Sequence, residues 1–338
     1  MTLARTRLLG AGLAAALASG TLLAASPTAH AAPVFISATT SQYHDTGQAS
    51  SCTNNSPAIP GTPVVPVAEN GAPTATSVST TAVFTNGGDP SDVLTNTATL
   101  QASSSVKSTN GLPTSITTSL SGTAAATATK GTSTCNAYAS AGLELDFDLT
   151  TTVPLWATLT VTKKGPGFIE SYIYEDNAVP YQDVYGRNLD GTGTVTVYLP
   201  PGHYRGYVEG DVSKRTATTS TTAFSGTASI TFAPVGSASK APSGKASKYV
   251  ALPGTRACAT HNATATLTTK KKRIKQIEKV TFSVNGKKAA TLKGKKLKKG
   301  KAVGLGLADN AAADITATVA LKNGKTRTVD ASYLACTS

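Results

Sequence analysis

The segment from Leu143 to Leu149 alternates without a break between apolar and acidic residues. Because successive side chains of a strand point to opposite faces, its four apolar residues can face a core while three carboxylates face away from it. Charged residues make up only 14% of the chain, and Thr, Ser, Ala, Gly and Val dominate it. Such a composition disfavours long amphipathic helices and favours strands with short side chains. The sequence therefore predicts an all-β fold.

Other segments have the same strand character, and turn residues separate them. In the first two thirds of the chain the expected strands are 34–36, 93–106, 143–149, 156–162, 168–174, 194–199, 203–209 and 227–232. In the last third they are 263–268, 280–284, 287–292, 315–321 and 326–329, with Asn-Gly turns at 285–286 and 323–324. For the Thr-, Ser- and Ala-rich region 74–132, a disordered or O-glycosylated stalk is the alternative to strands. Many short strands at this spacing are typical of antiparallel β-sandwiches.

The first thirty-one residues have the pattern of a secretory signal peptide. Arg5 and Arg7 precede an apolar run from Leu8 to Ala25, and Ala29-His-Ala31 offers a small-x-small cleavage site. The alternative is a retained membrane anchor, but the run is only weakly apolar and no second stretch of membrane-spanning length follows. We expect a mature chain that begins at Ala32 and is secreted, either extracellular or associated with the cell wall.

Four cysteines follow the predicted cleavage site, namely Cys52, Cys135, Cys258 and Cys336. An even number in an oxidising compartment predicts two disulfides, although four cysteines allow three connectivities. We favour Cys52–Cys135 and Cys258–Cys336, because each pair then lies within one compositional half of the chain. No Cys-x-x-Cys spacing indicates a metal site.

Charge divides the chain sharply. Residues 245–338 contain 20 Lys and Arg against 4 Asp and Glu, whereas residues 32–244 contain 9 against 14. A Gly- and Ser-rich stretch near the change in charge predicts a flexible linker. The expected organisation is a signal peptide at 1–31, a jelly-roll-like β-sandwich at 32–235, a linker at 236–248, and a lysine-rich immunoglobulin-like β-sandwich at 249–338.

Two stretches resemble known bacterial modules. The Val-x-Phe-x-Val-Asn-Gly-Lys-Lys hairpin at 280–288, with Cys258, the Asn-Gly-Lys-Thr hairpin at Asn323 and a closing Tyr333-x-x-Cys336, resembles immunoglobulin-like modules of secreted actinomycete-type proteins. The strand, Pro-Gly turn and strand at 193–208 resemble the choice-of-anchor and pre-peptidase C-terminal jelly-roll sandwiches of bacterial surface proteins. Neither resemblance implies catalytic residues for this chain.

The densest positive charge lies between Lys270 and Lys301, where there are fourteen Lys or Arg and one acid, Glu278. Outside a cell, such a surface attracts an anionic envelope polymer or acidic glycan by Coulombic forces with little specificity, and no specific nucleic acid is expected. The alternative is a solvated surface whose lysines keep sheet edges from pairing. The candidate polyanion-binding residues are Lys270, Lys271, Lys272, Arg273, Lys295, Lys296, Lys298 and Lys299.

Seven of the eleven tyrosines lie between Tyr172 and Tyr207, interspersed with carboxylates. Exposed rings beside carboxylates can stack on sugars and hydrogen-bond to them, whereas core packing is the more common role of alternating tyrosines. The candidate sugar-binding residues are Tyr172, Tyr174, Tyr181 and Tyr185. On the segment 143–149, Glu144, Asp146 and Asp148 can form a plain solvated face, a Ca²⁺ site or a glycosidase-type carboxylate pair. The solvated face is the interpretation we favour.

Signals for an enzyme are otherwise weak. The three histidines of the mature chain, His44, His203 and His261, are scattered, and no G-x-S-x-G, phosphate-binding or dinucleotide motif is present. We therefore expect a secreted, non-enzymatic surface or interaction protein that needs no cofactor or metal and acts in adhesion. A carbohydrate-binding module is the first alternative, and a secreted hydrolase is the second.

Overall fold

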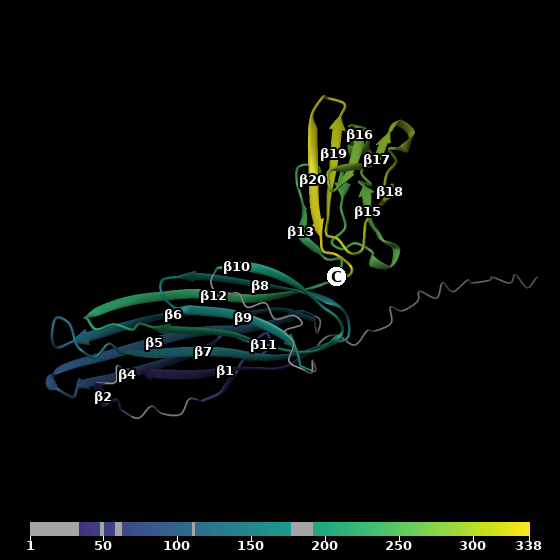
Figure 1. The fold of residues 1–338 in the computed structure, drawn as a ribbon. Coiled ribbons are helices and arrows are strands. Elements are labelled where there is room, and N and C mark those ends of the chain that lie inside the picture. Colours follow the sequence, from purple (N-terminus) through teal and green to yellow (C-terminus); the bar gives the residue numbers. More distant parts are fainter. Residues whose placement is uncertain (1–33, 48–50, 58–62, 110–111, 177–191) are drawn as a thin grey trace, which may run out of the picture. The chain divides into compact units, whose positions relative to one another are not determined.

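The computed structural model describes residues 34–47, 51–57, 63–109, 112–176 and 192–338 (Figure 1). The described chain is almost entirely β-structure, with one four-residue helix, α1 (Lys271–Ile274), and two short 3₁₀ turns, η1 (Cys258–Thr260) and η2 (Gly294–Lys296). The predicted all-β class is confirmed. The predicted signal peptide, Tyr181 and Tyr185 lie outside the described residues. No helix in the described part is long and apolar enough to cross a membrane.

The first sandwich contains two antiparallel sheets that enclose one hydrophobic core. The five-stranded sheet has the order β3-β1-β7-β11-β9, with β1 (Val34–Gly47), β3 (Val65–Pro66), β7 (Tyr138–Thr151), β9 (Phe168–Glu175) and β11 (Gly202–Ser213). The seven-stranded sheet has the order β10-β8-β12-β6-β5-β4-β2, with β2 (Cys52–Asn54), β4 (Thr74–Asn86), β5 (Asp89–Thr109), β6 (Leu112–Ala128), β8 (Leu155–Lys164), β10 (Gly193–Leu199) and β12 (Ser220–Pro234).

The first core is built by the alternation that the sequence shows. All four apolar side chains of the segment 143–149 are buried, while Glu144, Asp146 and Asp148 face outward. The Thr-, Ser- and Ala-rich region is not a stalk, because it forms β4, β5 and β6 as a long meander with a strictly alternating burial pattern on β5. Its small inward residues, such as Ala82 and Ala98, are fully buried. Short side chains therefore still bury enough surface for a two-layer core.

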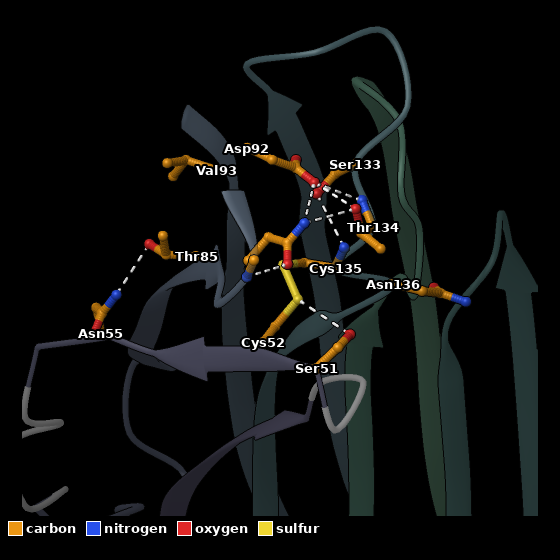
Figure 2. Close-up of a disulfide and its surroundings, with 12 residues drawn as sticks. Ser51, Cys52, Asn55, Thr85, Asp92, Val93, Ser133, Thr134, Cys135 and Asn136 are labelled. Carbon is orange, nitrogen blue, oxygen red and sulfur yellow. Dashed lines mark hydrogen bonds between the residues drawn. A yellow bond between two sulfur atoms is a disulfide. The ribbon is translucent and has the colours of Figure 1, made fainter. Parts of the chain in front are cut away.

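A disulfide between Cys52 and Cys135 ties β2 to the segment before β7, as predicted (Figure 2). Asp92, which is 2% exposed, caps this corner by accepting hydrogen bonds from the Thr134 hydroxyl at 2.7 Å and the Thr134 amide at 2.9 Å. The pKa of Asp92 lies well below its usual range, because these bonds and one from Ser133 stabilise the ionised carboxylate. The bond from the Thr134 hydroxyl has the largest effect on this pKa. The carboxylate thus fastens the segment that carries Cys135 to β5.

The second sandwich has its own hydrophobic core and its own disulfide, Cys258–Cys336, also as predicted. Its larger sheet has the order β13-β20-β19-β16-β17, with β13 (Ala238–Ser243), β16 (Ile277–Val284), β17 (Lys287–Lys293), β19 (Ala313–Leu321) and β20 (Thr326–Tyr333). Its smaller sheet has the order β14-β15-β18, with β14 (Val250–Ala251), β15 (Asn262–Leu267) and β18 (Ala302–Gly306). The jelly-roll-like and immunoglobulin-like assignments of the two sandwiches stay predictions.

The linker prediction for 236–248 is wrong over much of its length. Residues 238–243 form β13, which pairs with β20 at the edge of the larger sheet (Figure 1). Beyond the strand, Ala246 is fully buried in the second core, and its amide donates to the Thr328 carbonyl at 2.9 Å. An edge strand needs backbone hydrogen bonds on one side only, so a Gly-, Ser- and Ala-rich segment can form it without a hydrophobic signature.

Candidate functional site

Two surfaces bring the predicted site residues together, one on each sandwich. The first is the outer face of β7, β11 and β9, which we call the tyrosine–carboxylate face. The register pairs Tyr207 of β11 with Asp146 on one side and with Tyr172 on the other. One row along, Glu209 of β11 is paired with Glu144 and Glu170. Neighbouring side chains in such rows lie roughly 5 Å apart.

The tyrosines of this face form a contiguous group. The rings of Tyr172 and Tyr207 stack with their centroids 5.3 Å apart and an interplanar angle of 20°, and Tyr174 lies 5.6 Å from Tyr172. The side chains of all three are partly exposed and lie outside the core, whereas Tyr204 on the opposite face of β11 is fully buried. Core packing, the role favoured from the sequence, is therefore wrong for Tyr172 and Tyr174.

The three glutamates of the next row lie directly opposite one another although they carry like charges. Glu170 is 6% exposed, and the Tyr207 hydroxyl donates a hydrogen bond to its Oε1 atom at 3.0 Å. Burial, followed by repulsion from Asp146 and then from Glu209 and Glu170, raises the pKa of Glu144 to about 7. The favoured picture of a plain solvated face is therefore wrong for Glu144, because this carboxyl is part of a partly desolvated acidic row.

A hollow of about 310 Å³ opens beside the tyrosines, lined in part by Asp146, Asp148, Tyr174, Arg205 and Tyr207. The Arg205 Nε atom bridges Asp148 Oδ1 at 3.2 Å and Asp176 Oδ1 at 3.1 Å. No group of three or more His, Cys, Asp or Glu in the described chain is arranged to hold a metal ion. The Ca²⁺ alternative for the carboxylates of β7 therefore has no support in this part of the chain.

The second surface lies at one end of the second sandwich, where four chain segments meet. Backbone hydrogen bonds connect these segments to one another. The four bonds run from the amide of Ala246 to the carbonyl of Thr328, from Thr268 to Tyr249, from Gly300 to Thr268, and from Lys322 to Gln276. We call the surface formed by residues 244–249, 268–276, 293–301 and 321–327 the lysine end. It includes α1, η2 and the β19–β20 turn.

All eight predicted polyanion-binding residues belong to the lysine end. Four of them lie on α1 or directly before it, and the other four lie on η2 or in the turn that follows it. The four segments contain 16 of the 20 Lys and Arg in residues 245–338, and no Asp or Glu. Seven of the eight are exposed, while Arg273 is half-buried and its guanidinium donates to the Lys248 carbonyl at 3.0 Å. Arg273 therefore orders the surface as well as adding charge to it.

Eight further cations of the same end were not among the predicted residues, and four of them gather at one place. Lys275, Lys322, Lys325 and Arg327 line a second hollow of about 350 Å³ together with Tyr249, Gln276, Leu321 and Asn323. They were missed because Lys275 and the β19–β20 turn are about fifty residues apart in the chain, and only the pairing of β16 with β19 brings them together. A local density of lysine does not reveal such a grouping.

Comparison with known proteins gives no family for this chain. No family model matches, and no curated protein matches. Among solved structures, the adhesin domain of Epf from Streptococcus pyogenes matches with a TM-score of 0.17 and 9% sequence identity, covering 73% of this chain and 80% of that one. A TM-score this low shows neither a shared fold nor a shared function.

Proposed function

We propose that this protein is a secreted, non-enzymatic interaction protein whose second sandwich binds anionic polymers of a cell envelope or its surroundings through the lysine end. One observation carries the proposal. Four segments from different parts of the sequence converge at one end of a small domain, and together they contain 16 Lys and Arg and no Asp or Glu. Like charges at this density repel one another, so their convergence lowers stability unless an anion offsets it.

The physical mechanism is release of counterions. A polymer that carries one negative charge per repeating unit displaces small anions from the lysines and loses its own condensed cations, which favours binding at low salt. Lysine suits such loose contact, because its ammonium is a compact charge on a flexible stem. The two disulfides fit an oxidising compartment outside the cell, which is where such polymers are accessible.

The test compares two pairs of exposed lysines that change the net charge equally. Lys298 and Lys299 belong to the lysine end, whereas Lys287 and Lys288 begin β17 beyond the Asn285–Gly286 turn, at the opposite end of the sandwich. We expect K298Q/K299Q to weaken binding of the whole chain to a labelled linear polyphosphate by about threefold to tenfold at low salt, and K287Q/K288Q to have a much smaller effect. Equal losses in both variants would contradict the proposal.

The tyrosine–carboxylate face supports a second candidate function, binding of a neutral sugar. The observation in its favour is that stacked Tyr172 and Tyr207 adjoin Tyr174 at the hollow of about 310 Å³, which is also lined by carboxylates and Arg205. Aromatic rings beside hydrogen-bonding groups suit the apolar face and the hydroxyls of a pyranose.

An array of neutral oligosaccharides in about 0.5 M salt tests this candidate, since salt screens the attraction between charges. Binding that persists there and is lost in Tyr174→Ala, but not in Tyr138→Ala, would support it. Tyr138 is a suitable control because it lies at the start of β7, where its ring is covered by Arg215. Absence of any salt-resistant binding would refute sugar recognition by this face.

A further inference from the structure

The hollow of about 350 Å³ at the lysine end is a concave site, lined by residues from separate chain segments. It lies between the segment after α1 and the β19–β20 turn, where Lys322 N donates to Gln276 O at 2.9 Å. Its four cations come from three places in the sequence, with Lys275 before β16, Lys322 and Lys325 on the turn, and Arg327 on β20. No carboxylate lines it.

The neutral groups of the hollow are arranged as hydrogen-bond donors. The Gln276 side-chain oxygen already accepts a hydrogen bond from the Tyr249 hydroxyl at 3.2 Å. The Asn323 side-chain oxygen accepts the Lys325 backbone amide at 3.2 Å. With both oxygens engaged, the amide nitrogens of Gln276 and Asn323 remain to donate. Four cations and two donor groups around one hollow match a ligand group that only accepts hydrogen bonds.

Arg327 separates this hollow most clearly from a merely charged surface. The second sandwich has three arginines, and two of them are occupied by backbone carbonyls: Arg256 donates to Ala308 and Asp309, and Arg273 donates to Lys248. Arg327 has no side-chain hydrogen bond or ion pair within the described residues, and its Nε atom is shielded from solvent without a partner there. A guanidinium whose nitrogens have no acceptor in the described chain can donate its hydrogen bonds to a bound anion.

We infer that this hollow, which we call the Arg327 pocket, is a binding site for a single phosphate group, with the planar guanidinium of Arg327 contacting two phosphate oxygens and the lysines compensating the charge. The guanidinium fork matches the oxygen spacing of phosphate in a way that an ammonium does not. The inference refines the proposed function, since the phosphate would belong to the polymer that the lysine end attracts. It assigns that polymer to the phosphate class rather than to acidic glycans.

Calorimetric titration of the whole chain with inorganic triphosphate tests the site, since this probe is too short to span the lysine end. We expect R327K, which keeps the charge but loses the fork, to weaken triphosphate binding by about tenfold, in line with the loss of one bidentate contact. R215K is the matched control, because it makes the same exchange at an exposed arginine of the first sandwich, outside the lysine end. It should change the affinity by less than about threefold.

A second variant keeps the test decisive if R327K destabilises the sandwich. K322Q/K325Q changes two exposed residues of the turn and should also weaken triphosphate binding, whereas K298Q/K299Q should affect it less. Glucuronate, a monomer of acidic glycans that is too short to span the lysine end, should compete poorly with triphosphate at the pocket. Triphosphate binding that is equal in R327K and R215K, or that glucuronate displaces as readily as phosphate does, would overturn the inference.

The two proposals fail in different ways. If R327K binds triphosphate like the unmodified protein but K298Q/K299Q still weakens polyphosphate binding, the Arg327 pocket is wrong and the diffuse attraction stands. If neither variant affects its probe, the proposed function is wrong as well.

Discussion

Replacing Glu144 by Gln should stabilise the first sandwich above pH 7 and leave it nearly unchanged at pH 5. The pKa of Glu144 rises from 4.5 in the unfolded chain to about 7 in the folded chain. Burial is the largest cause, and repulsion from Asp146, Glu209 and Glu170 adds to it. The folded state therefore keeps a proton that the unfolded state releases. Stability from this group is fully present below about pH 4.5 and is lost as the pH rises through about 7.

The size of the effect follows from the shift in pKa. Each pKa unit corresponds to about 1.4 kcal/mol, so the shift from 4.5 to about 7 corresponds to at most ~3–4 kcal/mol. Glu144 is only partly buried, and solvent screening reduces the expected gain in unfolding free energy for E144Q to ~1–2 kcal/mol at pH 8. At pH 5 the carboxyl is largely protonated in the folded state, and Gln then resembles it in shape and charge.

Urea unfolding at pH 5 and pH 8, followed by Trp156 fluorescence, measures the difference in unfolding free energy. Trp156 is the only tryptophan and lies on β8 of the first sandwich. Glu69→Gln is the control, because it removes one exposed carboxylate from the same sandwich at a position outside the acidic row. Equal stability of E144Q and the unmodified protein at pH 8, or a gain at pH 5 as large as that at pH 8, would refute the reasoning.

Two further predictions concern stability. Removing the second disulfide by C258A/C336A should lower the unfolding free energy of the second sandwich by ~4 kcal/mol in the chain-entropy model, since the cysteines are 78 residues apart, and an unchanged melting temperature would contradict this. Gly206→Ala should cost ~1–3 kcal/mol, because its Cβ would lie 2.2 Å from the Phe147 ring. Gly131→Ala has nothing within 4 Å and should be nearly neutral in the same urea titration.

Local patterns in the sequence were enough to predict much of the fold. The alternation at 143–149 gave β7 its inward and outward faces, and the dipeptide Asn285–Gly286 forms the predicted turn with both residues at positive φ, 49° and 74°. Division of the chain by charge was enough to choose the disulfide pairing, because each pair closes within one sandwich. Each of these signals depends on neighbours in sequence or on composition alone.

Features that depend on long-range register could not be predicted. β13 was mistaken for a linker because its pairing with β20 rests on backbone hydrogen bonds that composition does not encode. The Glu144–Glu209–Glu170 row arises only when β11 is placed between β7 and β9. The same holds for the Arg327 pocket, whose residues lie on separate connections and show no common motif.

The most direct test of the account is the affinity of the whole chain for labelled linear polyphosphate across a salt series from about 0.05 M to about 0.5 M. If the lysine end is a polyanion-binding surface, the logarithm of the affinity should fall linearly with the logarithm of salt concentration, and the slope should be smaller in K298Q/K299Q than in K287Q/K288Q. An affinity that does not change with salt, or no measurable binding at the lowest salt, would contradict the central claim.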